Sequence, residues 1–155
     1  MKKEWQFSYE DFDSWKELSE EDQLLVQKAF SICEDAYAPY SEFKVGASLK
    51  MSDGQIILGS NQENVAFPSG MCAERVALYY AGSNFPDLEV LTLCIVAKGP
   101  FTSIDKILSP CGGCRQVILQ SEARQKNKMR VILVSQNDYT LVLDSAKDLV
   151  PFAFI

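Results

Sequence analysis

Three cysteines stand at spacings that suit the binding of a metal ion. Cys111 and Cys114 form a Cys-x-x-Cys pair in SPCGGCRQ, and Cys72 lies in the separate segment MCAER. Both segments are typical of helix starts, where partial positive charge stabilises thiolates. Three thiolates leave one position of a tetrahedral zinc ion open, which is the form of a catalytic rather than a structural site. The spacing therefore indicates a zinc site that could do chemistry.

Two other uses of these cysteines compete with that interpretation. A structural zinc site would need Cys33 or Cys94 as a fourth ligand. Cys33 lies on the apolar side of a predicted helix and Cys94 in a predicted buried strand, where cysteine behaves as a small hydrophobic residue. A thiol-redox role is the second alternative, because Cys-x-x-Cys also occurs in oxidoreductases. The odd number of five cysteines argues against a framework of disulfides.

Glu74, two residues after Cys72, favours catalysis over both alternatives. The sequence contains no histidine, so proton transfer near neutral pH must fall to a carboxylate, lysine, tyrosine or cysteine. A carboxylate in the first turn of a helix, beside an open metal position, could move protons between a bound water and a substrate. A purely structural zinc site has no use for such a residue.

The elements that must position these residues alternate between helices and strands. In chain order we predict a helix over 19–37, two strands within 43–60 joined by a turn at 52–54, a helix over 71–82, a strand over 89–97, a helix over 111–124, and strands over 129–135 and 139–144. This order predicts an α/β fold, a three-layer sandwich with one mixed sheet of about five strands flanked by helices. Residues 1–18 are predicted to be an N-terminal extension, and residues 19–155 a single domain.

Composition limits the partners of the chain. The net charge is −6, and no stretch interleaves basic and aromatic residues, so we expect no polynucleotide partner. No apolar run approaches the length of about 20 residues that a membrane span needs, and the first residues lack the pattern of a signal peptide. We therefore expect no membrane partner and a cytoplasmic location.

The sequence resembles the cytidine deaminase family, in its short form with three cysteine ligands. The resemblance runs from about Ala29 to Phe154 and includes APYSEFKVGASL, NQEN, MCAERVAL, SPCGGCRQVI and LVPFAF. It implies a zinc-dependent hydrolase that converts cytidine and 2′-deoxycytidine to uridine and 2′-deoxyuridine with release of ammonia, in pyrimidine salvage. Family analogy also implies a homotetramer, with a small-molecule nucleoside and water as its substrates.

The same resemblance assigns the metal and the catalytic residue. Zinc, one ion per subunit, would bind Cys72, Cys111 and Cys114. Glu74 would take a proton from the bound water and deliver protons to ring N3 and to the departing amine, while hydroxide attacks C4. Arg75 has a physical reason to lie beside this site: three thiolates around a divalent zinc ion leave a net charge of −1, and a guanidinium that donates to a thiolate sulfur would offset it.

Five further residues would contact the nucleoside by this resemblance. The Ala73 amide would meet the pyrimidine O2, the Ser109 carbonyl would meet the amine, and Phe43 would pack on the base. Asn61 and Glu63 would hold the ribose. Judged by residue type alone, Phe43 could be a core aromatic, and Asn61 and Glu63 could be turn residues.

Two features leave alternatives open. Phe67 stands where many relatives have tyrosine, which puts one hydroxyl contact to the sugar in doubt. The enzymatic alternative is deamination of another aminopyrimidine, such as a blasticidin-like nucleoside antibiotic, but those enzymes lack the second residue of the Asn61–Glu63 pair. The alternative from a different class is a non-catalytic zinc or thiol-redox module.

Overall fold

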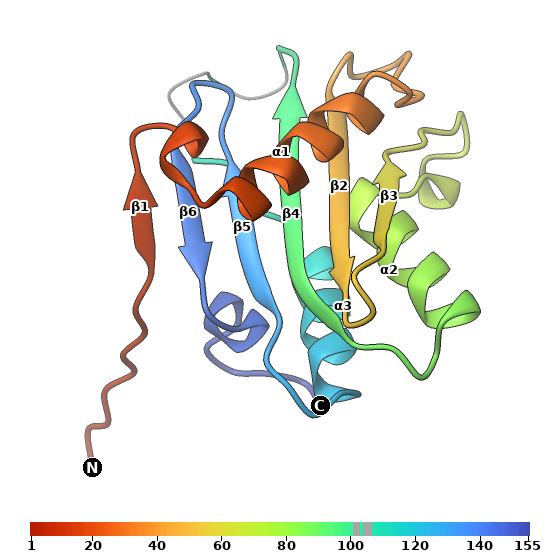
Figure 1. The fold of residues 1–155 in the computed structure, drawn as a ribbon. Coiled ribbons are helices and arrows are strands. Elements are labelled where there is room, and N and C mark those ends of the chain that lie inside the picture. Colours follow the sequence, from red (N-terminus) through yellow and green to blue (C-terminus); the bar gives the residue numbers. More distant parts are fainter. Residues whose placement is uncertain (101–102, 104–106) are drawn as a thin grey trace.

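A six-stranded mixed sheet organises the chain, in the order β1-β6-β5-β4-β2-β3 (Figure 1). The computed structural model describes residues 1–100, 103 and 107–155. Its elements are β1 (Glu10–Phe12), α1 (Glu20–Cys33), β2 (Lys44–Met51), β3 (Ile56–Ser60), α2 (Ala73–Asn84), β4 (Val90–Lys98), α3 (Gly112–Ala123), β5 (Arg130–Val134) and β6 (Thr140–Leu143), with short 3₁₀ helices at Trp15–Glu17, Phe67–Ser69 and Ala146–Leu149. The predicted α/β fold is confirmed, with six strands in place of about five.

Helices cover both faces of the sheet and make the three layers that the sequence predicts. One cluster of buried apolar side chains joins α1 to β4, β5 and β6, and the other joins α2 and α3 to the opposite face. In Figure 1, α1 lies in front of the sheet and α2 and α3 lie behind it.

Strand direction places the helix starts together. β2 runs antiparallel to both β3 and β4, so β3 and β4 run in the same direction. The helices α2 and α3 follow these two strands along the chain, and each therefore begins at the same end of the sheet. β4 and β5 are parallel, which requires the crossover that α3 provides.

Helix α1 ends earlier than predicted. The Ser19 side chain caps its start by accepting from the Asp22 amide at 3.2 Å, but the helix stops at Cys33 rather than Tyr37. The backbone of Tyr37 instead donates to the Asn61 carbonyl at 3.0 Å and accepts from the Glu63 amide at 2.8 Å. The sequence-based prediction missed this because these backbone partners lie more than twenty residues away.

The N-terminal residues add the sixth strand. β1 pairs antiparallel with β6, and Ser14 and Glu17 form a capping box around the 3₁₀ helix that follows. The boundary after residue 18 stays a prediction. Within the described part of the chain, no helix is both long and apolar enough to cross a membrane.

Candidate active site

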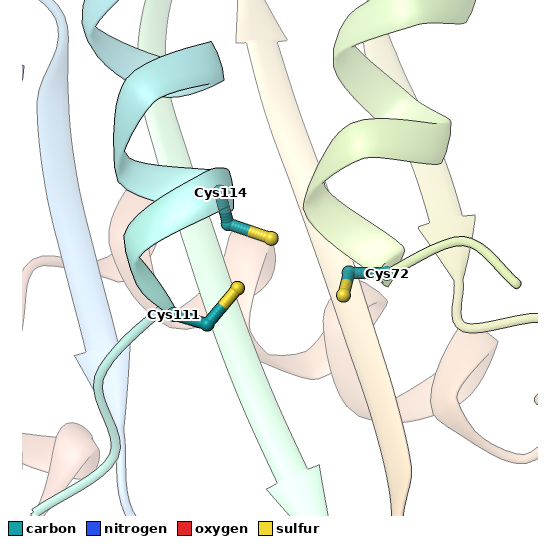
Figure 2. Close-up of side chains that lie close together, drawn as sticks. All are labelled: Cys72, Cys111 and Cys114. Atoms are coloured by element: carbon teal, nitrogen blue, oxygen red, sulfur yellow. The ribbon is translucent and has the colours of Figure 1, made fainter. Parts of the chain in front are cut away.

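Three sulfur atoms converge where α2 and α3 begin (Figure 2). Cys72 is the N-cap residue of α2, Cys111 is the N-cap residue of α3, and Cys114 lies in the first turn of α3. Their sulfur atoms all lie within 4.8 Å of one another, and among the described residues they form the one cluster suited to a metal ion. Two helix N-termini thus direct partial positive charge at the thiols.

The donor set fits zinc. At a usual Zn–S distance of about 2.3 Å, the sulfurs of a tetrahedral site lie roughly 3.8 Å apart, so only a small contraction of the cluster is needed. Cys33 and Cys94 lie outside the cluster, and burial raises the pKa of the Cys33 thiol to about 11 and also raises the pKa of the Cys94 thiol. A fourth cysteine ligand therefore has no support in this structure.

Charge within the cluster is unevenly distributed. The pKa of Cys72 falls to about 5, chiefly because the Cys114 thiol donates a hydrogen bond to it, with a further contribution from Arg75. Cys114 correspondingly has a raised pKa, because of the same bond and its burial. Arg75 Nη2 lies 3.6 Å from Cys72 Sγ, and its buried Nε has no acceptor among the described residues. The guanidinium thus has an unused donor next to the thiols.

Glu74 is buried beside the sulfurs. Its side chain is in the first turn of α2 with only 4% of the residue exposed. Burial raises the pKa of its carboxyl above the usual range, while a hydrogen bond from the Cys114 thiol partly opposes that shift. A raised pKa makes this carboxyl easier to protonate, which suits a group that must both accept and release a proton.

A cavity of about 410 Å³ is lined by Glu74 and by two of the three clustered cysteines, Cys72 and Cys111. Its volume is within the range of small-molecule sites. Most of the predicted site residues line it: Phe43, Asn61, Glu63, Cys72, Glu74, Ser109 and Cys111. Ala73, which lies between Cys72 and Glu74 in the chain, is fully buried. Arg75 instead lines a neighbouring cavity of about 720 Å³, which shares Asn61, Glu63, Phe67 and Cys72 with the first.

Asn61 and Glu63 also hold the loop that carries Phe43. Asn61 accepts from the Val45 amide at 2.7 Å and donates to the Phe43 carbonyl at 2.9 Å. Glu63 accepts from the Ser41 hydroxyl and from the Tyr40 amide at 2.9 Å. The Ser41 bond is the main reason that the pKa of Glu63 is lowered. The pair therefore has structural bonds as well as cavity-facing positions.

Sequence reasoning missed two residues that shape the cavity. The Ser41 hydroxyl accepts from the Phe43 amide at 3.1 Å as well as donating to Glu63. Arg115 donates to the Ser109 hydroxyl at 2.6 Å, to the Pro110 carbonyl at 3.0 Å and to the Leu149 carbonyl at 3.0 Å. Ser41 lies in the motif APYSEF and Arg115 in SPCGGCRQ. Their position inside these motifs could have indicated that they belong to the site.

Similarity to known proteins agrees with this geometry. Residues 19–129 match the family described as the cytidine and deoxycytidylate deaminase zinc-binding region. A cytidine deaminase of Halalkalibacterium halodurans is 41% identical over 98 residues, which cover 63% of this chain and 70% of that protein.

Solved structures show the same likeness. The cytidine deaminase of Burkholderia pseudomallei superposes with a TM-score of 0.69 at 34% identity, covering 85% of this chain and 98% of that one. The enzyme of Mycobacterium tuberculosis gives a TM-score of 0.65 at 29% identity, covering 86% of this chain and 96% of that one. Fold and similarity define an α/β deaminase. The chain belongs to the cytidine deaminase family and is an enzyme of that family, so the non-catalytic alternative is wrong.

Proposed function

We propose that the protein is a zinc-dependent hydrolase that deaminates cytidine and 2′-deoxycytidine. Water replaces the exocyclic amine at C4, so the products are the corresponding uridine and ammonia. The observation that carries this proposal is the buried Glu74, which lines the same cavity as Cys72 and Cys111 of the cysteine cluster. One zinc ion per subunit would be held by Cys72, Cys111 and Cys114. It would supply the Lewis acidity that lets a water molecule ionise near neutral pH.

Glu74 carries the protons in this proposal. Its carboxylate takes one proton from the attacking water and passes it to ring N3. It then takes the second proton from the hydroxyl added at C4 and passes it to the leaving amine, which departs as ammonia. Its raised pKa supports this role, because a carboxyl that titrates closer to neutrality can complete both transfers. Arg75 donates to the Cys72 sulfur and so holds that ligand as a thiolate.

The cavity walls orient the nucleoside. Phe43 packs on the base, the Ala73 amide donates to the pyrimidine O2, and the Ser109 carbonyl accepts from the amine. Asn61 and Glu63 bind ribose hydroxyls through the donor and acceptor capacity that their loop bonds leave unused. Glu63 favours cytidine over the blasticidin-like alternative, because the latter enzymes lack this residue.

We also propose that copies of the chain assemble into a homotetramer. Val65 and Phe67, beside the larger cavity, are 86% and 90% exposed. Phe152 and Phe154, near the C-terminus, are 92% and 87% exposed. Exposed apolar side chains of this kind are typical of protein contacts. All five cysteines are free thiols, which supports a reducing, cytoplasmic setting. The proposed role in pyrimidine salvage follows from the proposed nucleoside deamination.

Metal analysis and a nucleoside assay test the proposed activity. We expect about one zinc per chain, together with a loss of ultraviolet absorbance when cytidine or 2′-deoxycytidine is added. Removal of zinc by a chelator should abolish the activity, and zinc alone should restore it. A metal-free protein with full activity, or a zinc-loaded protein inactive on both nucleosides, would contradict the proposal.

A further inference from the structure

The N-terminal segment of residues 1–12 ends at an open edge of the sheet. β1 pairs with β6 on one side and is the last strand of the sheet on the other. Residues 1–9 are all exposed, and in Figure 1 they run on from β1 away from the body of the molecule. The match to the deaminase family begins only at residue 19, so this segment lies outside the matched region.

The position of this segment is fixed by contacts on its C-terminal side. Tyr139 donates through its hydroxyl to Asp11 at 2.7 Å, and Trp15 donates through its indole to Asp138 at 3.2 Å. Phe12 and Trp15 also pack against the apolar cluster under α1. These contacts hold β1 in the sheet, so the residues before it leave the sheet from a defined place.

Residues 1–9 do not have the character of a solvated tail. Trp5, Phe7 and Tyr9 alternate along it and are 54%, 53% and 55% exposed. The rings of Phe7 and Tyr9 lie on one side, with centroids 6.1 Å apart. Alternating aromatic residues are typical of a strand with one covered face, whereas solvated tails are poor in aromatics.

The charges of this segment are complementary to those of a second copy that runs antiparallel to it. Lys2 and Lys3 lie at one end, and Glu10 and Asp11 lie at the other. If two copies pair antiparallel about a two-fold axis at Gln6, Lys2 lies opposite Glu10 of the partner copy. This register places no like charges directly opposite each other, which would be destabilising.

The same register also pairs the aromatic residues. Trp5 lies opposite the second copy's Phe7, and the reverse pair follows by symmetry, so four rings meet on one face. Aromatic cross-strand pairs stabilise antiparallel sheets. Centring the axis at Phe7 would instead place Glu4 opposite Glu10, so the axis at Gln6 is favoured.

We propose that residues 1–11 form an intermolecular antiparallel ribbon with the same residues of a second copy, which joins two sheets through their β1 edges. An exposed edge strand offers unpaired backbone donors and acceptors to a second chain. A two-fold pairing uses the same edge on both copies and therefore closes after two chains. The proposal does not depend on the deaminase activity.

Single cysteines in the full chain test both the pairing and its register. In Gln6→Cys the two new thiols would lie directly opposite each other, at the separation a disulfide needs. In Glu4→Cys or Ser8→Cys alone, the two thiols would lie about 14 Å apart along the ribbon. Mild oxidation followed by a denaturing, non-reducing gel should therefore give a dimer band for Gln6→Cys and little for either control.

A mixture of the Glu4→Cys and Ser8→Cys proteins completes the test, because these positions face each other in the proposed register. The mixture should cross-link although neither protein does so alone, and the wild-type chain sets the background of its native cysteines. Equal cross-linking at all positions would show a flexible tail and overturn the proposal. Absence of any band above background, or cross-linking of Phe7→Cys in preference to Gln6→Cys, would overturn it as well.

Discussion

At the scale of single residues, the charge of the cysteine cluster depends on Arg75. Its guanidinium lies 3.6 Å from Cys72 Sγ and helps to hold the pKa of that thiol near 5, well below its ordinary value. Three thiolates around a divalent ion sum to a net charge of −1, which opposes ionisation of a bound water. The positive charge of the guanidinium offsets part of this negative charge and so makes ionisation of the water easier.

Replacement of Arg75 by glutamine should therefore move the acidic limb of the pH–rate profile to higher pH. Without the guanidinium the pKa of Cys72 rises, so its thiolate is lost at a higher pH as the pH falls. The pH dependence of kcat/KM checks the shift of the acidic limb. The ultraviolet absorbance of thiolate in the metal-free protein, followed against pH, checks the rise in the pKa of Cys72. Arg124→Gln, which removes an equal charge just after α3 ends, should leave both unchanged. An unmoved profile in Arg75→Gln would contradict the role.

Glu63 should make the enzyme prefer a nucleoside over its monophosphate. The lowered pKa keeps its carboxylate charged, so it repels a nearby phosphate. After screening by water, this repulsion should make kcat/KM for cytidine about tenfold higher than kcat/KM for cytidine monophosphate. Glu63→Gln should narrow this gap while weakening cytidine turnover. Ser41→Ala is the matched control, because it removes a bond to Glu63 but leaves the charge. Equal rates on cytidine and cytidine monophosphate in the wild type would contradict the assignment.

At the scale of elements, the position of α2 relative to the sheet depends on Gly59. A Cβ at this position would lie 2.6 Å from the Ala73 carbonyl oxygen and 2.7 Å from the Ala77 amide nitrogen. These backbone atoms belong to the first turns of the helix that carries Cys72 and Glu74. The absence of a side chain at Gly59 thus allows the helix start to reach the site.

Gly59→Ala should push α2 away from β3 and weaken both stability and metal binding. Overpacking of this kind typically costs about 1–3 kcal/mol, and we expect lower zinc affinity together with the lower melting temperature. Gly113→Ala in the first turn of α3 is the control, since nothing lies within 4 Å of its added Cβ. Alanine is also the better helix former. Unchanged melting and zinc affinity in Gly59→Ala would contradict this account.

Arg115 should act on the substrate side of α3 rather than on the metal. Its three hydrogen bonds join Ser109 and Pro110 to the carbonyl of Leu149. Bonds made by a charged donor contribute about 1.5–3 kcal/mol each, so Arg115→Gln should lower kcat/KM by at least about tenfold with zinc content preserved. Arg115→Lys should recover little, because one ammonium cannot reach three acceptors in this geometry. Full activity of Arg115→Gln would contradict the role.

At the scale of the whole molecule, the site residues that could be predicted from the sequence are those whose neighbours in the site are also close in the sequence. Cys111 and Cys114 share one helical turn, and Glu74 follows Cys72 in another, so their residue types and separations already indicated the cysteine cluster and the carboxyl beside it. The bonds of Arg115 were not predictable, because the Leu149 carbonyl is brought to it only by the folded chain.

The fold shows the same division. The buried strands and amphipathic helices were predicted from their apolar patterns, whereas β1 was missed because it is three residues long and carries two acidic side chains. Such a segment becomes a strand only through its pairing with β6. The early end of α1 has the same cause, since distant backbone partners replace the helical bonds of Tyr37.

The most direct test of the central claim is the turnover of Glu74→Gln measured together with its zinc content. We predict a folded protein with zinc bound and with turnover of cytidine reduced by at least about a hundredfold, the lower range for loss of general acid–base catalysis. Cys114→Ser is the paired control, and it should lose zinc as well as activity. Near-normal turnover by a zinc-loaded Glu74→Gln enzyme would contradict the claim that this carboxyl carries the protons.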